Sequence, residues 1–379
     1  MARREWFKNN DGSTRQIKSF DEMLMPTEAE IDVATKQYMQ KYDSLKKAFR
    51  QKTKLTNYDI TLMLIAAGLQ CLRWALVSNN SFRFTNAVDG EKFVDSVGKG
   101  VSHYLPTVGE IITDHQVPYD AVTTSEAYKI RFANSELNPI STGLSGRNHR
   151  YMTLGHDPLA GLVVGTMNIA TNTLTKNDFT LSSYLVYNNQ IDMPVTFFEV
   201  LDMTKEAYDE DKLAIGAAFL KQVIHCSTDV FTKQGLPLPI INTLSPDASR
   251  FLMGNGIDLY SVTRGIALTM LINKFVEMVH KLYFNPNSDD KKLYDVRTRK
   301  VLTYSNILSS VINIGYVGVS GDMSRLDVGG VLVTLWRIFN DEKIIKQIEM
   351  EFIQKSLDND YQKEEDQVQE ELAKLGFII

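Results

Sequence analysis

Two short stretches of the chain gather side chains that could hold a metal ion. In IHCSTDVFTKQGLPLP, at 224–239, His225 and Asp229 stand four residues apart, and a Gly-Leu-Pro turn follows. In a helix this spacing places both side chains on one face, where they could grip one cation. An imidazole with a carboxylate suits zinc, manganese or iron without choosing among them. A structural His–Asp hydrogen bond is the alternative.

The second stretch, GLSGRNHRYMTLGHDPLAGLVVG at 143–165, holds His149, His156 and Asp157. Its two histidines are seven residues apart, but Gly155 and Pro158 argue against one continuous helix. Asp157 precedes a proline at the favoured first position of a helix, so its carboxylate is expected to cap that helix. The same carboxylate could also orient a metal-activated water as a general base.

Other charged residues could support such a site. The small-residue loop before His149 carries Arg147 and Arg150, which could bind a phosphate group, although an ordinary surface turn explains the loop equally well. On a long helix, Glu277 and His280 stand three residues apart and are candidates to orient metal ligands. A buried histidine with satisfied hydrogen bonds is the alternative for His280.

Composition limits the class of protein. The chain has 379 residues, of which 44% are hydrophobic and 23% charged, and its net charge is −5. These values are typical of a soluble globular protein, and they give no strong signal for nucleic-acid binding. Two cysteines cannot form a disulfide framework, which fits a reducing cytoplasm. The N-terminus has no apolar core of a signal peptide, so no secretory signal is expected.

Hydrophobic periodicity predicts a mainly α protein, a multi-helix bundle with irregular loops and at most a small β-hairpin. Thr27 and Glu30 have capping-box spacing before an amphipathic helix over 26–51. A helix over 56–77 is apolar nearly all round, which predicts burial. The remaining expected elements are helices over 158–172, 211–235, 245–254, 258–283, 302–316 and 326–339, a strand pair over 180–188 and 194–201, and an acidic solvated helix within 341–379.

These elements suggest four segments. They are a polar N-terminal arm (1–25), a helical hairpin packing on the core (26–80), a helical core with the metal site (81–285), and C-terminal helices with an acidic tail (286–379). Two uncharged runs, 158–175 and 301–321, have about the length of a membrane span. Thr, Ser, Asn and Gly dilute both runs, so we expect core helices, and peripheral membrane contact stays open.

The two histidine stretches together resemble a family of bacterial membrane-bound metal-dependent hydrolases, also described as LexA-binding and inner-membrane-associated. The family carries His-Arg-x-x-Thr-His, then His-x3-Asp-x2-Thr followed by Gly-x-Pro and a further proline. Residues 149–153 match the first element, but its second histidine falls late, at His156. The second element is matched position by position at His225, Asp229, Thr232, Gly235, Pro237 and Pro239. The match covers 149–239, and the chain departs from the family in lacking convincing transmembrane helices.

The resemblance implies a helical bundle in which His149, His156, His225 and Asp229 converge on a divalent metal, with zinc or manganese preferred. The family's reaction is unassigned, so the resemblance implies hydrolysis without naming a bond. We expect a metal-activated water to attack a phosphoester from a phospholipid, nucleotide or nucleic acid. The expected location is the cytoplasm, with inner-membrane association as an extension. The alternative function is a non-catalytic helical interaction or membrane-associated protein that uses its apolar helices. Phosphohydrolases with a His-Asp dyad are another helical metal scaffold, but the spacing here fits them less well.

Overall fold

The described part of the chain is mainly helical. The computed structural model describes residues 6–8, 14–16, 27–77, 83, 96, 99–100, 102–103, 106, 109, 116–121, 129–130, 140–146, 148–232 and 234–374. Its longer helices are α2 (Glu28–Lys52), α3 (Asn57–Leu76), α8 (Ala160–Thr171), α9 (Phe197–Glu210), α10 (Lys212–Val230), α12 (Pro246–Gly254), α13 (Leu259–Leu282), α14 (Lys291–Ser320) and α15 (Val328–Lys374). Short helical turns are α6 (Pro118–Ala121), α7 (His149–Met152), η1 (Leu154–His156), α11 (Ile241–Leu244) and η2 (Met323–Arg325). The predicted fold class is therefore confirmed.

Strands make a minor contribution. A three-stranded antiparallel sheet has the order β5 (Thr173–Thr175), β6 (Ser183–Tyr187), β7 (Gln190–Val195). Two further antiparallel pairs are β1 (Trp6–Lys8) with β2 (Thr14–Gln16), and β3 (Lys129–Ile130) with β4 (Ile140–Ser141). The predicted strand over 194–201 was wrong in its bounds. Thr196 and Glu199 form a capping box that starts α9 at Phe197, so the strand ends at Val195.

The chain divides into two compact units. Unit 1 comprises Met1–Thr61, Val279–Val301 and Arg337–Ile379, and unit 2 comprises Leu62–Met278 and Leu302–Trp336. The division differs from the four expected segments, because α3, α13, α14 and α15 each contribute residues to both units. The tail also differs, since α15 runs without a break from Val328 to Lys374 where two helices were expected.

Unit 1 has a buried polar centre of its own. Asp59 caps the start of α3 by accepting from the backbone N–H of Thr56. One carboxylate oxygen of Asp59 lies 2.8 Å from Nε2 of His280, and the other lies 3.1 Å from Nε of Arg297. Nδ1 of His280 bonds the hydroxyl of Thr298 at 2.8 Å. His280 is thus a buried histidine with both ring nitrogens satisfied, which was the alternative considered for it.

The core of unit 2 surrounds α8 and the three-stranded sheet. One apolar cluster contains Ile169 of α8, Leu174 of β5, Ile191 of β7 and Ala218 of α10. A second cluster joins Val164 of α8 to Val200 of α9. Helix α8 is largely buried and ends at Asn172, whose left-handed backbone terminates it. The prediction of a core helix in this run is confirmed.

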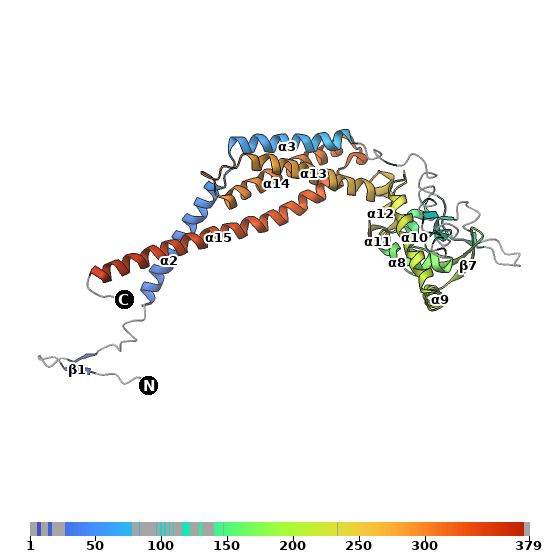
Figure 1. Ribbon diagram of the computed structural model, residues 1–379, viewed down its shortest axis with the longest axis horizontal. Helices are drawn as coiled ribbons and strands as arrows, with labels where there is room; N and C mark the ends of the chain where they lie inside the picture. Colours follow the sequence, from blue (N-terminus) through green and yellow to red (C-terminus); the bar gives the residue numbers. More distant parts are fainter. Residues whose placement is uncertain are drawn as a thin grey trace. The chain divides into compact units, whose positions relative to one another are not determined.

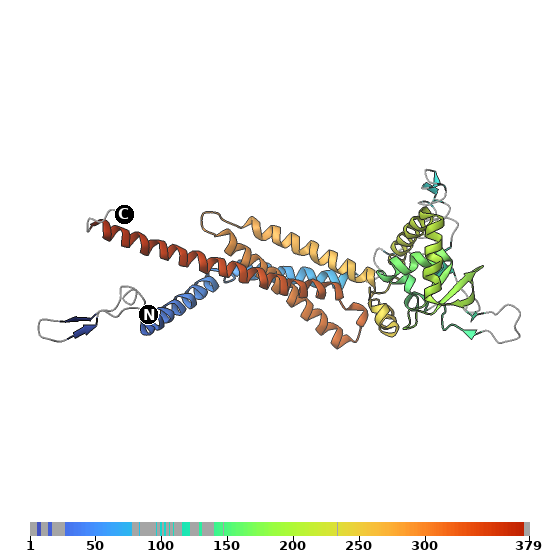
Figure 2. The ribbon, with the colours of Figure 1, turned by 90° about the horizontal axis from the view of Figure 1, so that it is seen from below.

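In unit 2, segments of α3, α13, α14 and α15 lie side by side (Figure 1 and Figure 2). Some of their contacts are polar: the Gln70 amide donates to Thr269 and Asn273, and Asn306 donates to Asn273. The prediction that α3 is buried was wrong. Leu64, Ile65 and Leu72 are each more than half exposed, because only one face of this apolar helix meets its neighbours.

Candidate metal centre

Five side chains from four elements of unit 2 meet in one place. Asp120 comes from α6, His149 from α7, His156 from η1, and His225 with Asp229 from α10. They form two groups that share His156, namely Asp120–His149–His156 and His156–His225–Asp229. In each group the potential ligand atoms all lie within 4.8 Å of one another. The four residues predicted as metal ligands are thus brought together, with Asp120 in addition.

The separations between these ligand atoms suit a shared cation. Oδ2 of Asp229 lies 3.4 Å from Nε2 of His225 and 3.5 Å from Nε2 of His156. Oδ1 of Asp120 lies 3.0 Å from Nε2 of His149 and 3.7 Å from Nε2 of His156. Two ligands bound tetrahedrally to one zinc ion, at bonds of about 2.1 Å, stand roughly 3.4 Å apart. The side chains therefore need little movement to share an ion.

Thr153 fixes which nitrogen of His156 faces the centre. The Thr153 hydroxyl donates its only hydrogen to the carbonyl of His149 at 2.7 Å, because a carbonyl can only accept. The hydroxyl oxygen must then accept from Nδ1–H of His156 at 2.9 Å. Nε2 is left with its lone pair directed at Asp120 and Asp229. Burial lowers the pKa of His156 to about 3, so this lone pair is available at neutral pH.

His149 is oriented in the same way by a different partner. Its Nδ1 donates to the carbonyl of Gly146 at 3.1 Å, so Nε2 faces Oδ1 of Asp120. Burial opposes ionisation of Asp120, but the neighbouring imidazoles of His149 and His156 outweigh it and hold the pKa of this carboxyl well below its usual value. Asp120 is also the most exposed of the five, with 36% of its side chain accessible. The centre therefore opens on the side of Asp120.

Three buried atoms at the centre have no hydrogen-bond partner among the described residues. They are Nε2 of His156, Nε2 of His225 and Oδ2 of Asp229. Distances of 3.4 and 3.5 Å between them exceed the usual hydrogen-bond length, so a shared proton satisfies them poorly. Unpaired buried polar atoms are costly, whereas a divalent cation would satisfy all three at once. The donor set thus fits a metal ion.

Arg150 holds Asp229 in position. Its guanidinium donates to Oδ1 of Asp229 at 3.0 Å, and to the Thr232 hydroxyl and the Gly235 carbonyl at 3.0 Å each. Burial raises the pKa of Asp229 despite the opposing charges of His225 and Arg150. Gly235 adopts a φ of +63°, which glycine tolerates best, and so places its carbonyl at Arg150. The Gly-Leu-Pro turn after α10 therefore supports the centre.

Asp157 has a structural position beside the centre. One of its oxygens accepts the backbone N–H groups of Leu159 and Ala160, both at 2.9 Å. The other accepts the N–H of Ile240 at 3.2 Å and the Thr243 hydroxyl at 3.3 Å. Asp157 is fully buried, and neither described group of potential metal ligands includes it. The carboxylate bonds the backbone before the helix as expected, although α8 begins at Ala160 and not at Pro158. Because both oxygens accept hydrogen bonds, Asp157 does not take the position expected of a general base.

The remaining predicted residues lie elsewhere. Arg150 was expected to bind a phosphate group, but its bonds to Asp229, Thr232 and Gly235 engage it instead. Arg147 lies outside the described residues. Glu277 pairs with Lys274 at 3.3 Å, and His280 belongs to unit 1, where it bonds Asp59 and Thr298. The structure therefore does not bring Glu277 or His280 to the described metal-ligand groups.

Gly155, which precedes His156, lies against the ring of Tyr119. The Tyr119 ring lies so close that a Cβ on Gly155 would overlap it, at 2.5 Å. The carbonyl of Gly155 accepts from the Gln222 amide, which also donates to Sγ of Cys226. Burial raises the pKa of the Cys226 thiol to about 12, so this neighbour of His225 stays a neutral core side chain at physiological pH.

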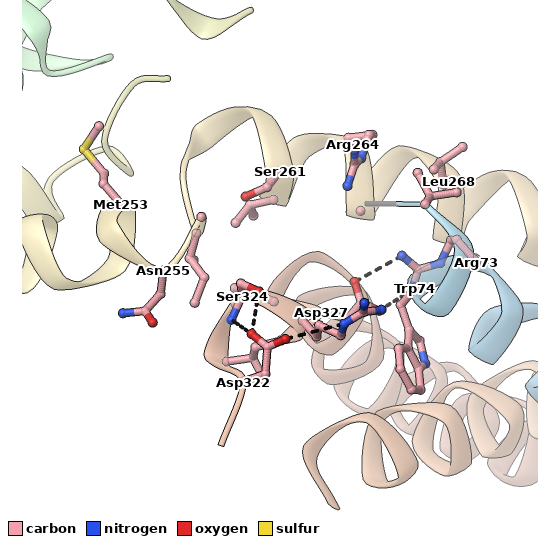
Figure 3. Close-up of a pocket in the computed structure, with 18 of the residues that line it drawn as sticks. Arg73, Trp74, Met253, Asn255, Ser261, Arg264, Leu268, Asp322, Ser324 and Asp327 are labelled. Carbon is pink, nitrogen blue, oxygen red and sulfur yellow. Dashed lines mark hydrogen bonds and ion pairs between the residues drawn. The ribbon is translucent and has the colours of Figure 1, made fainter. Parts of the chain in front are cut away.

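A polar cavity of about 440 Å³ at the end of the unit 2 helices is separate from the centre. Its charged lining is already paired: Arg73 bonds Asp327, and Arg325 pairs with Asp322 at 3.5 Å (Figure 3). None of the five residues of the candidate metal centre lines it. We therefore assign the reaction proposed below to the opening at Asp120.

Sequence reasoning missed Asp120 and the orienting role of Thr153. Asp120 stands in VPYDAV, which has no helical spacing to any histidine. Only the folded chain brings α6 against the elements that carry the other ligands. Thr153 was visible as a matched position of the resemblance, and a hydroxyl three residues before a histidine was the available signal.

Comparisons with protein-family models, with curated proteins and with solved structures found no match to this chain. The resemblance to the membrane-bound hydrolases therefore stays a prediction carried by the residues of the two stretches.

Proposed function

We propose that the chain is a metal-dependent hydrolase whose centre is held by His149, His156, His225 and Asp229, with Asp120 as a further ligand. The supporting observation is the convergence of three buried, unpaired ligand atoms on one point. A purely structural His–Asp pair would be expected to close its own hydrogen bond. Here Thr153 orients the ring of His156 and Arg150 holds Asp229, so that the ligand atoms face one another without closing a hydrogen bond.

A divalent ion in this site, with zinc or manganese as candidates, would supply Lewis-acid chemistry and lower the pKa of a bound water towards 7. The chain itself supplies a rigid set of three imidazoles and a carboxylate with a buried arginine behind it. Asp120, at the open edge, is placed to orient the attacking water and to meet the substrate first. A phosphoester is the substrate class we propose.

The hydrolase proposal predicts metal-dependent turnover of a simple phosphoester. Wild-type protein should hydrolyse bis-p-nitrophenyl phosphate or p-nitrophenyl phosphate. The rate should fall at least about 100-fold after chelation and return when zinc or manganese is added. His225→Ala should be inactive under every condition. His103→Ala is the matched control, because His103 is an exposed histidine outside the centre and should keep full activity. A metal-loaded wild type without activity on either ester would contradict the proposal.

Association with a membrane is a second candidate function, and the unit 2 helices support it. Buried Gln70, Asn273 and Asn306 face one another, while the outer face carries large apolar side chains that are about half exposed or more. These include Leu64, Ile65, Leu72, Leu76, Met270, Leu271, Phe275, Val311, Ile314, Val319, Leu335 and Trp336. Polar groups between helices and apolar groups outside are the arrangement that lipid favours. One described helix, α3, is long and apolar enough to cross a membrane.

This candidate function predicts binding to lipid vesicles. The protein should float with vesicles of phosphatidylcholine and phosphatidylglycerol, as a cytoplasmic protein held at the inner membrane would. Replacing Leu64 and Leu72, two exposed residues of α3, by serine should lower the floated fraction at least threefold. Serine at Leu220, an apolar position on α10 that is 37% exposed, is the control. Wild-type protein that stays wholly in the soluble fraction would rule the association out.

A further inference from the structure

Ile240 has a backbone conformation that its side chain disfavours. Its φ is +68°, in the left-handed region, where a β-branched residue is rare and strained. Glycine or asparagine would relieve this strain. The isoleucine side chain does not compensate by packing, because it is 53% exposed. Its exposure and its strain together suggest that the apolar side chain is kept at this point for contact with a ligand.

Ile240 is one of four exposed apolar side chains on the two segments that Asp157 joins by its hydrogen bonds. The two oxygens of this carboxylate accept the N–H groups of Leu159 and of Ile240. One helical turn beyond each lie Val163 and Leu244. Leu159, Val163 and Leu244 are 54%, 64% and 74% exposed. We call Leu159, Val163, Ile240 and Leu244 the apolar ridge.

The apolar ridge is directly connected to the candidate metal centre. Asp157, which anchors both sides of the ridge, follows the ligand His156 in the chain. Both residues are fully buried, so the connection is rigid. The ridge is therefore anchored one residue from a candidate metal ligand. A phospholipid carries a phosphoester and apolar chains in one molecule.

We propose that the apolar ridge contacts the hydrocarbon of a bilayer and so presents a phospholipid to the metal centre as substrate, an inference that rests on the proposed hydrolase function. A second protein chain fits the ridge less well, because four aliphatic side chains fall short of the roughly 1,000 Å² that a stable protein interface buries. The apolar outer face of the unit 2 helices points to the same lipid environment. Insertion of exposed aliphatic side chains into acyl chains needs no shape complementarity.

The first test separates lipid hydrolysis from hydrolysis of a soluble ester. Ile240→Gly removes the side chain and relieves the backbone strain. This variant should therefore fold, and its melting temperature should equal or exceed that of wild type. We expect it to hydrolyse bis-p-nitrophenyl phosphate within twofold of wild type, but phosphatidylglycerol vesicles at least 10-fold more slowly. Leu213→Ser, at a 61% exposed leucine in the first turn of α10, is the control and should change neither rate. Equal effects of Ile240→Gly on both substrates would overturn the proposal.

The second test reads lipid contact without activity. Leu244→Cys in a Cys71→Ser background is labelled with the fluorophore NBD, while Cys226 stays unlabelled because burial raises its pKa to about 12. Vesicles should brighten the label at least twofold and shift its emission to the blue, and a label introduced by Leu213→Cys should not respond. An unchanged signal at position 244 overturns the ridge proposal. If the label at position 244 responds to vesicles but neither substrate is hydrolysed, the proposed hydrolase function is overturned. The assignment of a phospholipid substrate is then overturned as well.

Discussion

Replacement of Asp229 by asparagine should abolish metal binding while leaving the fold intact. The amide oxygen can still accept from Arg150, as Oδ1 of Asp229 does at 3.0 Å. The amide nitrogen would then face Nε2 of His156 and Nε2 of His225, which lack a hydrogen-bond partner among the described residues. An amide donor satisfies these nitrogens but is a poor ligand for a divalent ion. We therefore expect metal affinity to fall at least about 100-fold by isothermal titration calorimetry.

The thermal stability of this variant discriminates between the two explanations of the His–Asp cluster. Without metal, Asp229→Asn pairs the central nitrogens but gives up the buried ion pair with Arg150, so the discriminating measurement is the response of the melting temperature to metal. Added zinc or manganese should raise the melting temperature of wild type and leave the variant unchanged. If metal stabilises the variant as much as wild type, Asp229 is not a ligand.

Arg150→Met should be among the most destabilising single substitutions in unit 2. It removes three hydrogen bonds and leaves the buried carboxylate of Asp229 without the guanidinium of Arg150. Breaking a buried ion pair on one side costs about 3–5 kcal/mol. Urea denaturation of the chelated protein should show that the free energy of unfolding falls by this amount. Arg150→Lys should recover only part of it, since an ammonium group cannot reproduce the planar fork.

Arg250→Met is the control for charge removal on the surface. Arg250 is an exposed residue of α12, and its replacement should change stability by less than about 0.5 kcal/mol. Saturating metal should restore part of the stability lost in Arg150→Met, because the ion would compensate the charge of Asp229. If the free energy of unfolding of Arg150→Met falls by less than about 1 kcal/mol, Arg150 does not stabilise the position of Asp229 as argued.

Local patterns predicted most of the helices, since their signals lie within a few residues. Thr27 and Glu30 form the expected capping box, and α13 occupies almost the expected range. Two errors came from tertiary context. The apolar run of α3 predicts burial only if neighbours surround it, and they cover one face. The acidic tail joins the preceding helix in α15 because nothing between residues 339 and 341 breaks the helix.

Spacing predicted the metal-ligand candidates better than their supporting residues. His225 and Asp229 lie on one face of α10 as the four-residue spacing requires. His149 and His156 meet although no helix joins them, because Thr153 and Gly155 shape the turn between α7 and η1. Asp120 has no sequence relation to these residues. Arg150 looks like a phosphate ligand in a loop until the fold places Asp229 against it.

X-ray absorption at the edge of the bound metal tests the central claim most directly. Protein purified without chelator should contain about one ion per chain, with a first shell of nitrogen and oxygen at roughly 2.0–2.2 Å and the multiple-scattering pattern of histidine. Asp229→Asn should give no such spectrum. A shell with sulfur at about 2.3 Å, which would implicate Cys226, or protein without stoichiometric metal, would contradict a centre built from His149, His156, His225 and Asp229.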